Sequence, residues 1–264
     1  MPLITLTTDF GLSDIYVGVM KGVICTIAPH ARVIDLTHDV PPQSVSVAAF
    51  LLEAAAPYFP WGAVHVAVVD PGVGSGRRIV CARTSRATYL APDNGLLGPV
   101  LERDPPAHVY SVENPEYFLP EVSSTFHGRD IFSPVAAHLA LGLDPRHLGT
   151  EVDSLRDLRL PRPSSLGVGR LAGEVLHVDR FGNLVTNLRL DDLGRVREAR
   201  VEGRAVAGPV RAAYAECAPG EVLLIGGSSG LLEVSVNQGS AAALLGAGRG
   251  ASIEVNIEAR EESP

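Results

Sequence analysis

The sequence predicts an α/β protein with an N-terminal, mainly parallel α/β sandwich domain and a smaller C-terminal, β-barrel-like domain. In the first part of the 264-residue chain, short β-branched runs alternate with longer runs at helical spacing, which is typical of βαβ units. A stretch rich in Arg, Pro, Ser and Gly then interrupts the apolar pattern. Beyond it, short strand-like runs follow one another closely, as in a small barrel.

The same changes of pattern set the domain boundaries. We expect an N-terminal α/β domain over residues 1–154, a linker over residues 155–170 and a C-terminal β domain over residues 171–264. The linker prediction rests on the sequence LRDLRLPRPSSLGVGR, which has no apolar periodicity. With 46% hydrophobic residues, the chain has enough apolar side chains to bury a sizeable core.

The first elements of the N-terminal domain alternate between strand and helix, which implies right-handed connections and a parallel sheet. Ser13 is a candidate cap for the first helix, and Pro29 ends its apolar spacing. The run AVHVAVVD is apolar on both faces, as a buried central strand should be. Strands are expected at 3–8, 32–38, 63–70, 78–84, 87–93 and 108–113, and helices at 15–27, 44–59, 94–103 and 130–142.

The C-terminal domain is expected to be almost entirely strand. Its one helix candidate is the short run GSAAALLG, residues 239–246. Strands are expected at 173–179, 183–188, 199–203, 221–227, 231–236 and 251–258.

Charge and cysteine content exclude several classes of protein. The formal net charge of -8 and the absence of charge runs argue against nucleic-acid binding. The 3 cysteines have no C-x-x-C spacing, so we expect neither a disulfide framework nor a thiolate metal site, and a reducing cytoplasm fits best. Lys21 and Glu53 interrupt the two apolar stretches near the N-terminus, so we expect no membrane span.

Titratable residues follow several of the expected strands, at the edge where open α/β sheets bind their ligands. Asp9 and Asp14 follow the first strand, and Asp70 ends the third. The sequence FHGRD places His127 in the turn before the last helix of the domain. We therefore expect these side chains to converge on one edge of the sheet.

Ordinary structural roles fit some of the same residues on spacing alone. Asp9 and Asp14 are equally compatible with capping a helix and interacting with its dipole. Asp70, in the sequence DPG, is equally compatible with a β-turn that has Pro at its first inner position. His38 and Asp39 fit a turn better than a site.

The glycine-rich sequence DPGVGSGRR, residues 70–78, does not fit a phosphate-binding loop. No Lys, Ser or Thr follows its last glycine, and it leads into a strand rather than into a helix N-terminus. The sequence also lacks H-x-H and H-E-x-x-H, and its acids are not paired at ligand spacing, so we expect no metal site.

Five motifs together resemble one known family: TTDFGLSDIYVGVMKG, DPGVGSGRR, APDNGLL, TFHGRDIF and VDRFGNLVTN. They are similar, in order and in both domains, to the S-adenosyl-L-methionine (SAM) hydroxide adenosyltransferases, the SAM hydrolases related to fluorinase and chlorinase. The resemblance implies hydrolysis of SAM to adenosine and L-methionine by attack of water-derived hydroxide on the ribose C5'. It implies SAM as the substrate and no cofactor.

The resemblance also implies which residues act on the water. The family's Asp, Arg and His fall here on Asp70, Arg77 and His127. The family spacing selects Arg77 over Arg78, and strand alternation would point the Arg78 side chain to the opposite face. The halogenating relatives carry Tyr at the positions of Asp70 and His127. A halide site needs no proton acceptor, so these differences favour hydrolysis.

Substrate contacts carry over in the same way. The resemblance implies that Asp9 binds the ribose hydroxyls, and that Asp14 and Asp179, with Ser228 or Ser229, bind the amino-acid end of SAM. Phe181 and Asn183 would meet the adenine, although a β-turn with a packed Phe explains their sequence equally well. The relatives form trimers, which implies a homotrimer with adenosyl sites between the N-domain of one subunit and the C-domain of the next.

Two alternatives stay open. One is a halogenase-like enzyme that cleaves SAM with a halide nucleophile. The other, from a different class, is a non-catalytic SAM- or adenosine-binding protein, because the binding residues would look the same.

Overall fold

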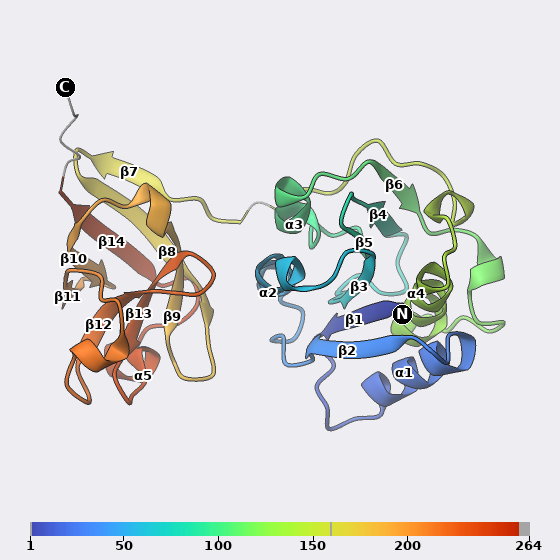
Figure 1. Ribbon diagram of the computed structural model, residues 1–264, viewed down its shortest axis with the longest axis horizontal. Helices are drawn as coiled ribbons and strands as arrows, with labels where there is room; N and C mark the ends of the chain where they lie inside the picture. The colour runs from blue at the N-terminus through green and yellow to red at the C-terminus, as the bar shows by residue number, and fades with distance from the viewer. Residues whose placement is uncertain (1, 159, 259–264) are drawn as a thin grey trace. The chain divides into compact units, whose positions relative to one another are not determined.

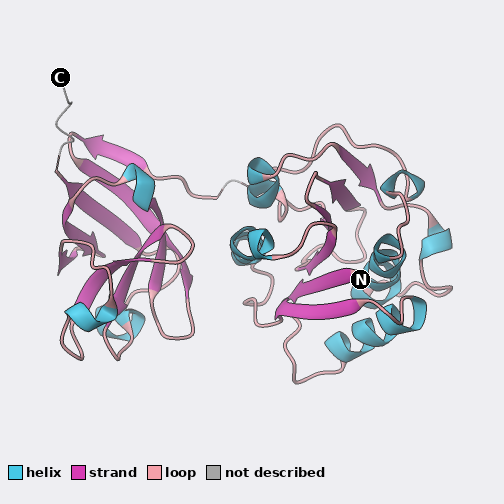
Figure 2. Ribbon diagram, viewed as in Figure 1, coloured by secondary structure: helices cyan, strands magenta, loops and turns pink. Residues whose placement is uncertain are grey.

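A computed structural model describes residues 2–158 and 160–258, which form two compact units, Met1–Arg159 and Leu160–Pro264 (Figure 1). Residue 159 of the expected linker and residues 259–264 of the expected C-terminal domain lie outside the described residues. Figure 2 shows helices and strands in the first unit and mainly strands in the second. The predicted combination of an α/β part and a barrel-like part is confirmed.

The first unit contains one mainly parallel sheet in the order β2-β1-β3-β5-β4-β6. Pairing is parallel from β2 through β1 and β3 to β5, whereas β4 is antiparallel to both β5 and β6. Every residue of β3 is buried, as predicted for a central strand. The strands are β1 (Leu3–Thr8), β2 (Arg32–Thr37), β3 (Ala63–Val68), β4 (Ile79–Arg83), β5 (Ala87–Pro92) and β6 (His108–Ser111).

Helices cover both faces of this sheet. Successive strand residues point to opposite faces, so their apolar side chains form two cores, one on each face. Val66 and Val68 of β3 pack in the core that contains α1 (Tyr16–Ile27) and α4 (Ser133–Ala140). Ala67 packs in the other core, with α2 (Val45–Ala55) and α3 (Gly98–Arg103).

Helix ends in this unit differ in part from the prediction. Ile15 occupies the N-cap position of α1 and no side chain caps the helix, so the prediction that Ser13 caps it is wrong. The last predicted helix divides into η3 (Gly128–Phe132), a π-helix, and α4. Three short 3-10 helices complete the unit: η1 (Ala56–Tyr58), η2 (Pro115–Tyr117) and η4 (Pro145–His147).

The second unit is a nearly closed sheet in the order β11-β10-β14-β8-β9-β13-β12. The strands β11 and β12 are the two edges of this sheet. The amide of Arg211, in the segment after β11, donates to the carbonyl of Leu224 in β12 at 2.7 Å, which links the two edges. The strands are β8 (Arg170–Val178), β9 (Leu184–Arg189), β10 (Val196–Val201), β11 (Arg204–Ala207), β12 (Val222–Gly226), β13 (Leu231–Val236) and β14 (Ser252–Ile257).

Strand β7 (Ser164–Gly167) lies inside the expected linker and pairs with β8. Its residues are all exposed, so the sequence carries no apolar alternation that would have identified it. The predicted short helix is present as α5 (Ala241–Leu245): the Ser240 hydroxyl accepts from the Ala243 amide at 3.1 Å, and Gly246 ends the helix with φ of 60°. The 3-10 helices η5 (Leu190–Asp192) and η6 (Tyr214–Glu216) complete the unit.

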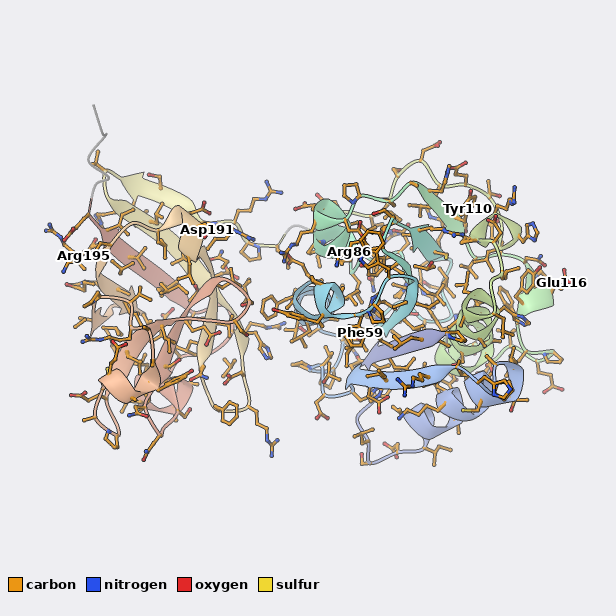
Figure 3. The ribbon with its side chains drawn as sticks, viewed as in Figure 1. Phe59, Arg86, Tyr110, Glu116, Asp191 and Arg195 are labelled. Atoms are coloured by element: carbon orange, nitrogen blue, oxygen red, sulfur yellow. The ribbon has the colours of Figure 1, made fainter. Side chains whose placement is uncertain are left out.

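His65 of β3 is part of the core rather than of a site. Its Nδ1 is 2.8 Å from the Thr5 hydroxyl, and its ring stacks on Tyr89 with centroids 5.1 Å apart. Phe59, labelled in Figure 3, meets the same ring edge-on at 5.5 Å. Burial lowers the pKa of His65 to about 4, so this histidine is neutral at pH 7.

Candidate active site

The first unit presents Asp9 and Asp70 at the same edge of its sheet. They follow β1 and β3, which are parallel neighbours with Thr8 opposite Val68. Asp9 comes directly after β1 and Asp70 is the second residue after β3, so both side chains start from the edge where open α/β sheets bind ligands.

The loop between β3 and β4 folds Arg77 back onto Asp70. The Arg77 Nε lies 2.8 Å from each carboxylate oxygen of Asp70, and the Arg77 Nη2 contacts Oδ2 as well. The two side chains are only 8% and 5% exposed, so water screens this ion pair weakly.

Two glycines explain how the loop turns so tightly. A Cβ at Gly72 would lie 3.3 Å from the Arg77 Cγ, against which the loop is folded. Gly74 has φ of +75°, and a Cβ there would lie 2.4 Å from the Ser124 carbonyl oxygen. The glycines therefore bring the ends of the loop together and allow it to approach the segment that carries His127.

Arg77 also contacts His127, with 2.9 Å between Nη2 and the His127 Nδ1. Arginine has only donors, so Nδ1 is the acceptor and a neutral His127 carries its proton on Nε2. Burial, and after it the Arg77 guanidinium, hold the pKa of His127 below its ordinary value of 6.5. The structure thus brings together all three residues that the resemblance assigns to the water.

A buried carboxylate orders the turn around His127. Asp130, in the π-helix η3, is 0% exposed, and it accepts from the Arg129 Nε at 2.5 Å and from the Ser123 amide at 2.8 Å. A Cβ on Gly128 would lie 3.1 Å from the Phe10 ring and 3.2 Å from that of Phe126. The His127 turn therefore packs against the loop that carries Asp9.

The neighbouring Arg78 pairs elsewhere. Its Nε donates to Asp93 Oδ2 at 3.0 Å and its Nη2 donates to the Ser154 carbonyl at 3.0 Å. The two consecutive arginines, both before the start of β4 at Ile79, therefore pair with different carboxylates.

Asp9 and Asp14 do not cap α1, since no side chain accepts at its N-terminus. Asp9 Oδ2 instead accepts from the Gln43 amide at 2.7 Å, and Gln43 has φ of 63°. Asp14 is exposed and lies in the loop with Leu12 and Ile15, which are 67% and 75% exposed.

His38 is a buried structural residue in the bend after β2. Its Nδ1 is 2.8 Å from the Thr8 hydroxyl and its Nε2 is 3.0 Å from the Asp35 carboxylate. This ties the loop after β2 to the end of β1.

The second unit places most of its predicted substrate-binding residues around an open pocket of about 680 Å³. Asp179, Phe181, Asn183 and Ser228 line it, whereas Ser229 is not among the lining residues. Tyr214 and Glu233 also line it, and no motif in the sequence pointed to them. Burial, and after it Asp179, raise the pKa of Glu233.

The sequence DRFGN forms a tight turn, three residues of which line this pocket. The Asp179 carboxylate accepts from the Phe181 amide at 2.9 Å, and from the Asn183 amide and the Asn183 Nδ2 at 2.8 Å each. Asn183 is 6% exposed, but Phe181 is 76% exposed, so the alternative of a turn with a packed Phe is wrong for Phe181.

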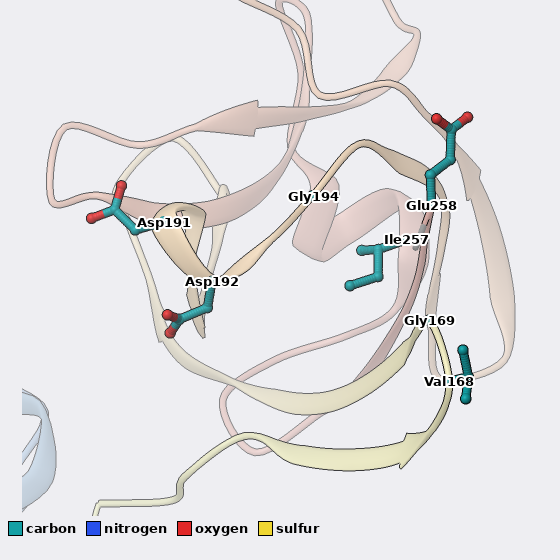
Figure 4. A pocket seen from close by; sticks show the side chains of 7 residues that line it. All are labelled: Val168, Gly169, Asp191, Asp192, Gly194, Ile257 and Glu258. Carbon is teal, nitrogen blue, oxygen red and sulfur yellow. The ribbon is translucent and has the colours of Figure 1, made fainter. Parts of the chain in front are cut away.

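A second pocket in this unit, of about 480 Å³, is lined by seven residues, of which Asp191, Asp192 and Glu258 are acidic (Figure 4). Glu258 pairs with Arg197 at 3.1 Å and with Arg195 at 3.8 Å.

Within residues 2–158 and 160–258, no group of three or more His, Cys, Asp and Glu residues could hold a metal ion. In that same part of the chain, no helix is long and apolar enough to cross a membrane.

The chain is similar to proteins of one known family. The family models for the SAM hydroxide adenosyltransferase N-terminal and C-terminal domains match residues 4–149 and 173–254. A protein of Thermus thermophilus named (R)-S-adenosyl-L-methionine hydrolase is 46% identical over 255 residues, 94% of this chain and 97% of the relative. A fluorinase of Actinoplanes sp. is 29% identical over 73% of each chain.

A solved structure of a conserved protein from Thermotoga maritima is similar in fold, with a TM-score of 0.91 and 39% identity over 96% of this chain and 99% of that one. A second, from Thermus thermophilus, has a TM-score of 0.79 and 44% identity over 97% of this chain and 100% of that one. With both family models matched in order, the chain belongs to the SAM hydroxide adenosyltransferase family.

Proposed function

We propose that this protein hydrolyses SAM to adenosine and L-methionine. Hydroxide derived from water forms a bond to the ribose C5', the C5'–S bond breaks, and its electron pair stays on the sulfur of methionine. The observation that carries the proposal is Arg77, which bridges Asp70 and His127 in a largely buried cluster. The name of the Thermus thermophilus relative supports the same reaction.

The chemistry requires help mainly at the water. A sulfonium is a good leaving group, but neutral water, with a pKa of about 15.7, is a poor nucleophile. Arg77 stays protonated and offsets the negative charge that develops on the attacking oxygen. Asp70 accepts hydrogen bonds from Arg77 and still has lone pairs for the water proton.

We assign His127 the role of a donor. Its Nδ1 lone pair faces Arg77, so its Nε2–H points away from the ion pair and can orient the water or the hydroxide. This goes beyond the resemblance, which leaves open which of the three residues takes the proton.

For substrate binding we propose that Asp9 accepts from the ribose hydroxyls, and that Phe181 stacks on the adenine while Asn183 bonds to its edge. The large exposed face of Phe181 supports the stacking role. For the amino-acid end we propose Asp14 and Asp179 with a serine. Ser228 is favoured over Ser229 because Ser228 lines the pocket.

We further propose a homotrimer with sites at its subunit interfaces, a cytoplasmic location, and SAM as substrate with no cofactor. Exposed apolar side chains near proposed ligand residues, such as Leu12, Ile15 and Phe181, support an interface there. The cysteines Cys25, Cys81 and Cys217 are free thiols, which supports a reducing compartment.

Product analysis tests the proposal directly. Purified protein is incubated with the R and S sulfonium epimers of SAM separately, in halide-free and in chloride buffers, and adenosine, methionine and 5'-chloro-adenosine are separated. We expect adenosine without halide, and a preference for the R epimer, for which the Thermus thermophilus relative is named. Product that requires halide would indicate the halogenase alternative, and binding without any product would indicate a SAM-binding protein.

A further inference from the structure

The loop that carries Asp70 and Arg77 is connected at both ends to the two residues that follow β5. Asn94 contacts the residue before Asp70, since its Nδ2 donates to the Val69 carbonyl at 2.9 Å. Asp93 contacts the residue after Arg77, since its amide donates to the Arg78 carbonyl at 2.9 Å. The same short segment therefore reaches both ends of the loop.

At the first end, the Asn94 side chain bonds to a backbone carbonyl that no longer has a partner in the pairing of β3 with β5. The pairing of β3 with β5 ends with Val66 opposite Leu90, so the Val69 carbonyl lies beyond the sheet. That carbonyl belongs to the peptide plane that leads into Asp70, so a bond to it limits how the Asp70 side chain can move. Asn94 is itself fixed, because its Oδ1 accepts from the Leu96 amide at 3.2 Å.

At the second end, Asp93 adds a buried carboxylate to the backbone bond. Its side chain is 2% exposed and accepts from the Arg78 Nε at 3.0 Å. The other oxygen accepts from the Arg156 amide at 2.8 Å. Arg78, the residue next to Arg77, is thereby fixed by an ion pair of its own.

We propose that Asp93 and Asn94 are positioning residues for the Asp70–Arg77 pair; this inference rests on the proposed function. Neither residue contacts the pair directly. Each restrains a neighbour in the chain, so that the guanidinium and the carboxylate keep the geometry in which Arg77 also reaches His127. The reaction rate is sensitive to the positions of these two groups, since a displacement of about 1 Å can lower the rate by a factor of about 100.

The chain offers a matched control in Asn114. Its Nδ2 donates to the His147 carbonyl at 3.0 Å and its Oδ1 accepts from the Glu116 amide at 3.1 Å, the same two kinds of contact that Asn94 makes. Neither partner belongs to the proposed site. A serine in place of each asparagine keeps a side-chain oxygen that can accept from the amide two residues ahead. It removes the Nδ2 group that donates to the distant carbonyl.

We expect Asn94→Ser to lower kcat by about 10- to 100-fold while KM for SAM changes less than about two-fold, and Asn114→Ser to change neither. The second readout is the titration of the His127 ring protons by NMR. Arg77 lowers the pKa of His127, whereas Asp70 and Asp130 raise it, so a displaced Arg77 should move the pKa upward. If Asn94→Ser does not fold, Asp93→Asn serves as the variant, with the same two expected changes.

Wild-type kcat together with an unchanged His127 titration in Asn94→Ser would overturn the proposal, as would equal losses in Asn94→Ser and Asn114→Ser. Failure of the proposed function is distinguishable. If the wild-type protein cleaves no SAM, the His127 titration alone decides whether Asn94 positions Arg77.

Discussion

The two units present their candidate site residues in opposite ways. In the first unit, Asp70 and Arg77 are 5% and 8% exposed and bond to each other, and Arg77 bonds to His127. In the second, the residues line an open pocket, and Phe181 leaves 76% of its surface exposed. A cluster that stabilises a developing charge must be ordered and shielded before substrate arrives, whereas a stacking surface must stay open until the ligand covers it.

The largest effect should come from breaking the shielded cluster. We expect Asp70→Ala, Arg77→Ala and His127→Ala each to lower kcat by about 10²- to 10⁴-fold, because each removes help to the attacking water. SAM binding, measured by calorimetry, should persist, since the binding groups of the second unit are untouched.

Arg146→Ala is the matched control for Arg77→Ala. Arg146 also pairs with an aspartate, Asp144, at 2.9 Å, but its side chain is 68% exposed. It should leave kcat unchanged. Loss of SAM binding in the cluster variants, with normal turnover of whatever SAM is bound, would contradict their assignment to catalysis.

A smaller effect, and on the other kinetic constant, is expected from the open pocket. Phe181→Ala should raise KM by about 5- to 150-fold, the equivalent of about 1–3 kcal/mol of lost stacking, and leave kcat at saturation close to wild type. Leu244→Ala is the control, because Leu244 is 54% exposed in the same unit but does not line the pocket. A fall in kcat without a change in KM would show that the two regions do not divide the work in this way.

The sequence predicted the parts of the site that depend on strand ends. Asp9 and Asp70 follow neighbouring parallel strands, and the apolar runs identified both strands. The spacing of the family motif selected Arg77 over Arg78, and in the structure the two arginines pair with different carboxylates, Asp70 and Asp93.

Features that depend on contacts between distant segments could not be predicted. Nothing local to Gln43 indicates a left-handed backbone that turns its amide toward Asp9. The π-helix at Gly128–Phe132 has the sequence of an ordinary helix start, and the close approach of Gly128 to Phe10 is visible only in the structure. Strand β7 carries no apolar alternation because all of its residues are exposed.

The smallest expected effect is a displacement of the acid limb of the pH–rate profile. Protonating Nδ1 of His127 would remove the acceptor that Arg77 uses, so the active form is the neutral imidazole. Burial and Arg77 lower the pKa of His127 below 6.5. At pH 6.5, more than half of the protein molecules therefore carry a neutral His127. The acid limb of kcat/KM should therefore lie below pH 6.5, and NMR titration of His127 should give the same midpoint.

Phe181→Ala should shift KM without moving this limb, because Phe181 carries no charge. A limb at or above pH 6.5, or one that moves with Phe181→Ala, would mean that His127 does not set the pH dependence.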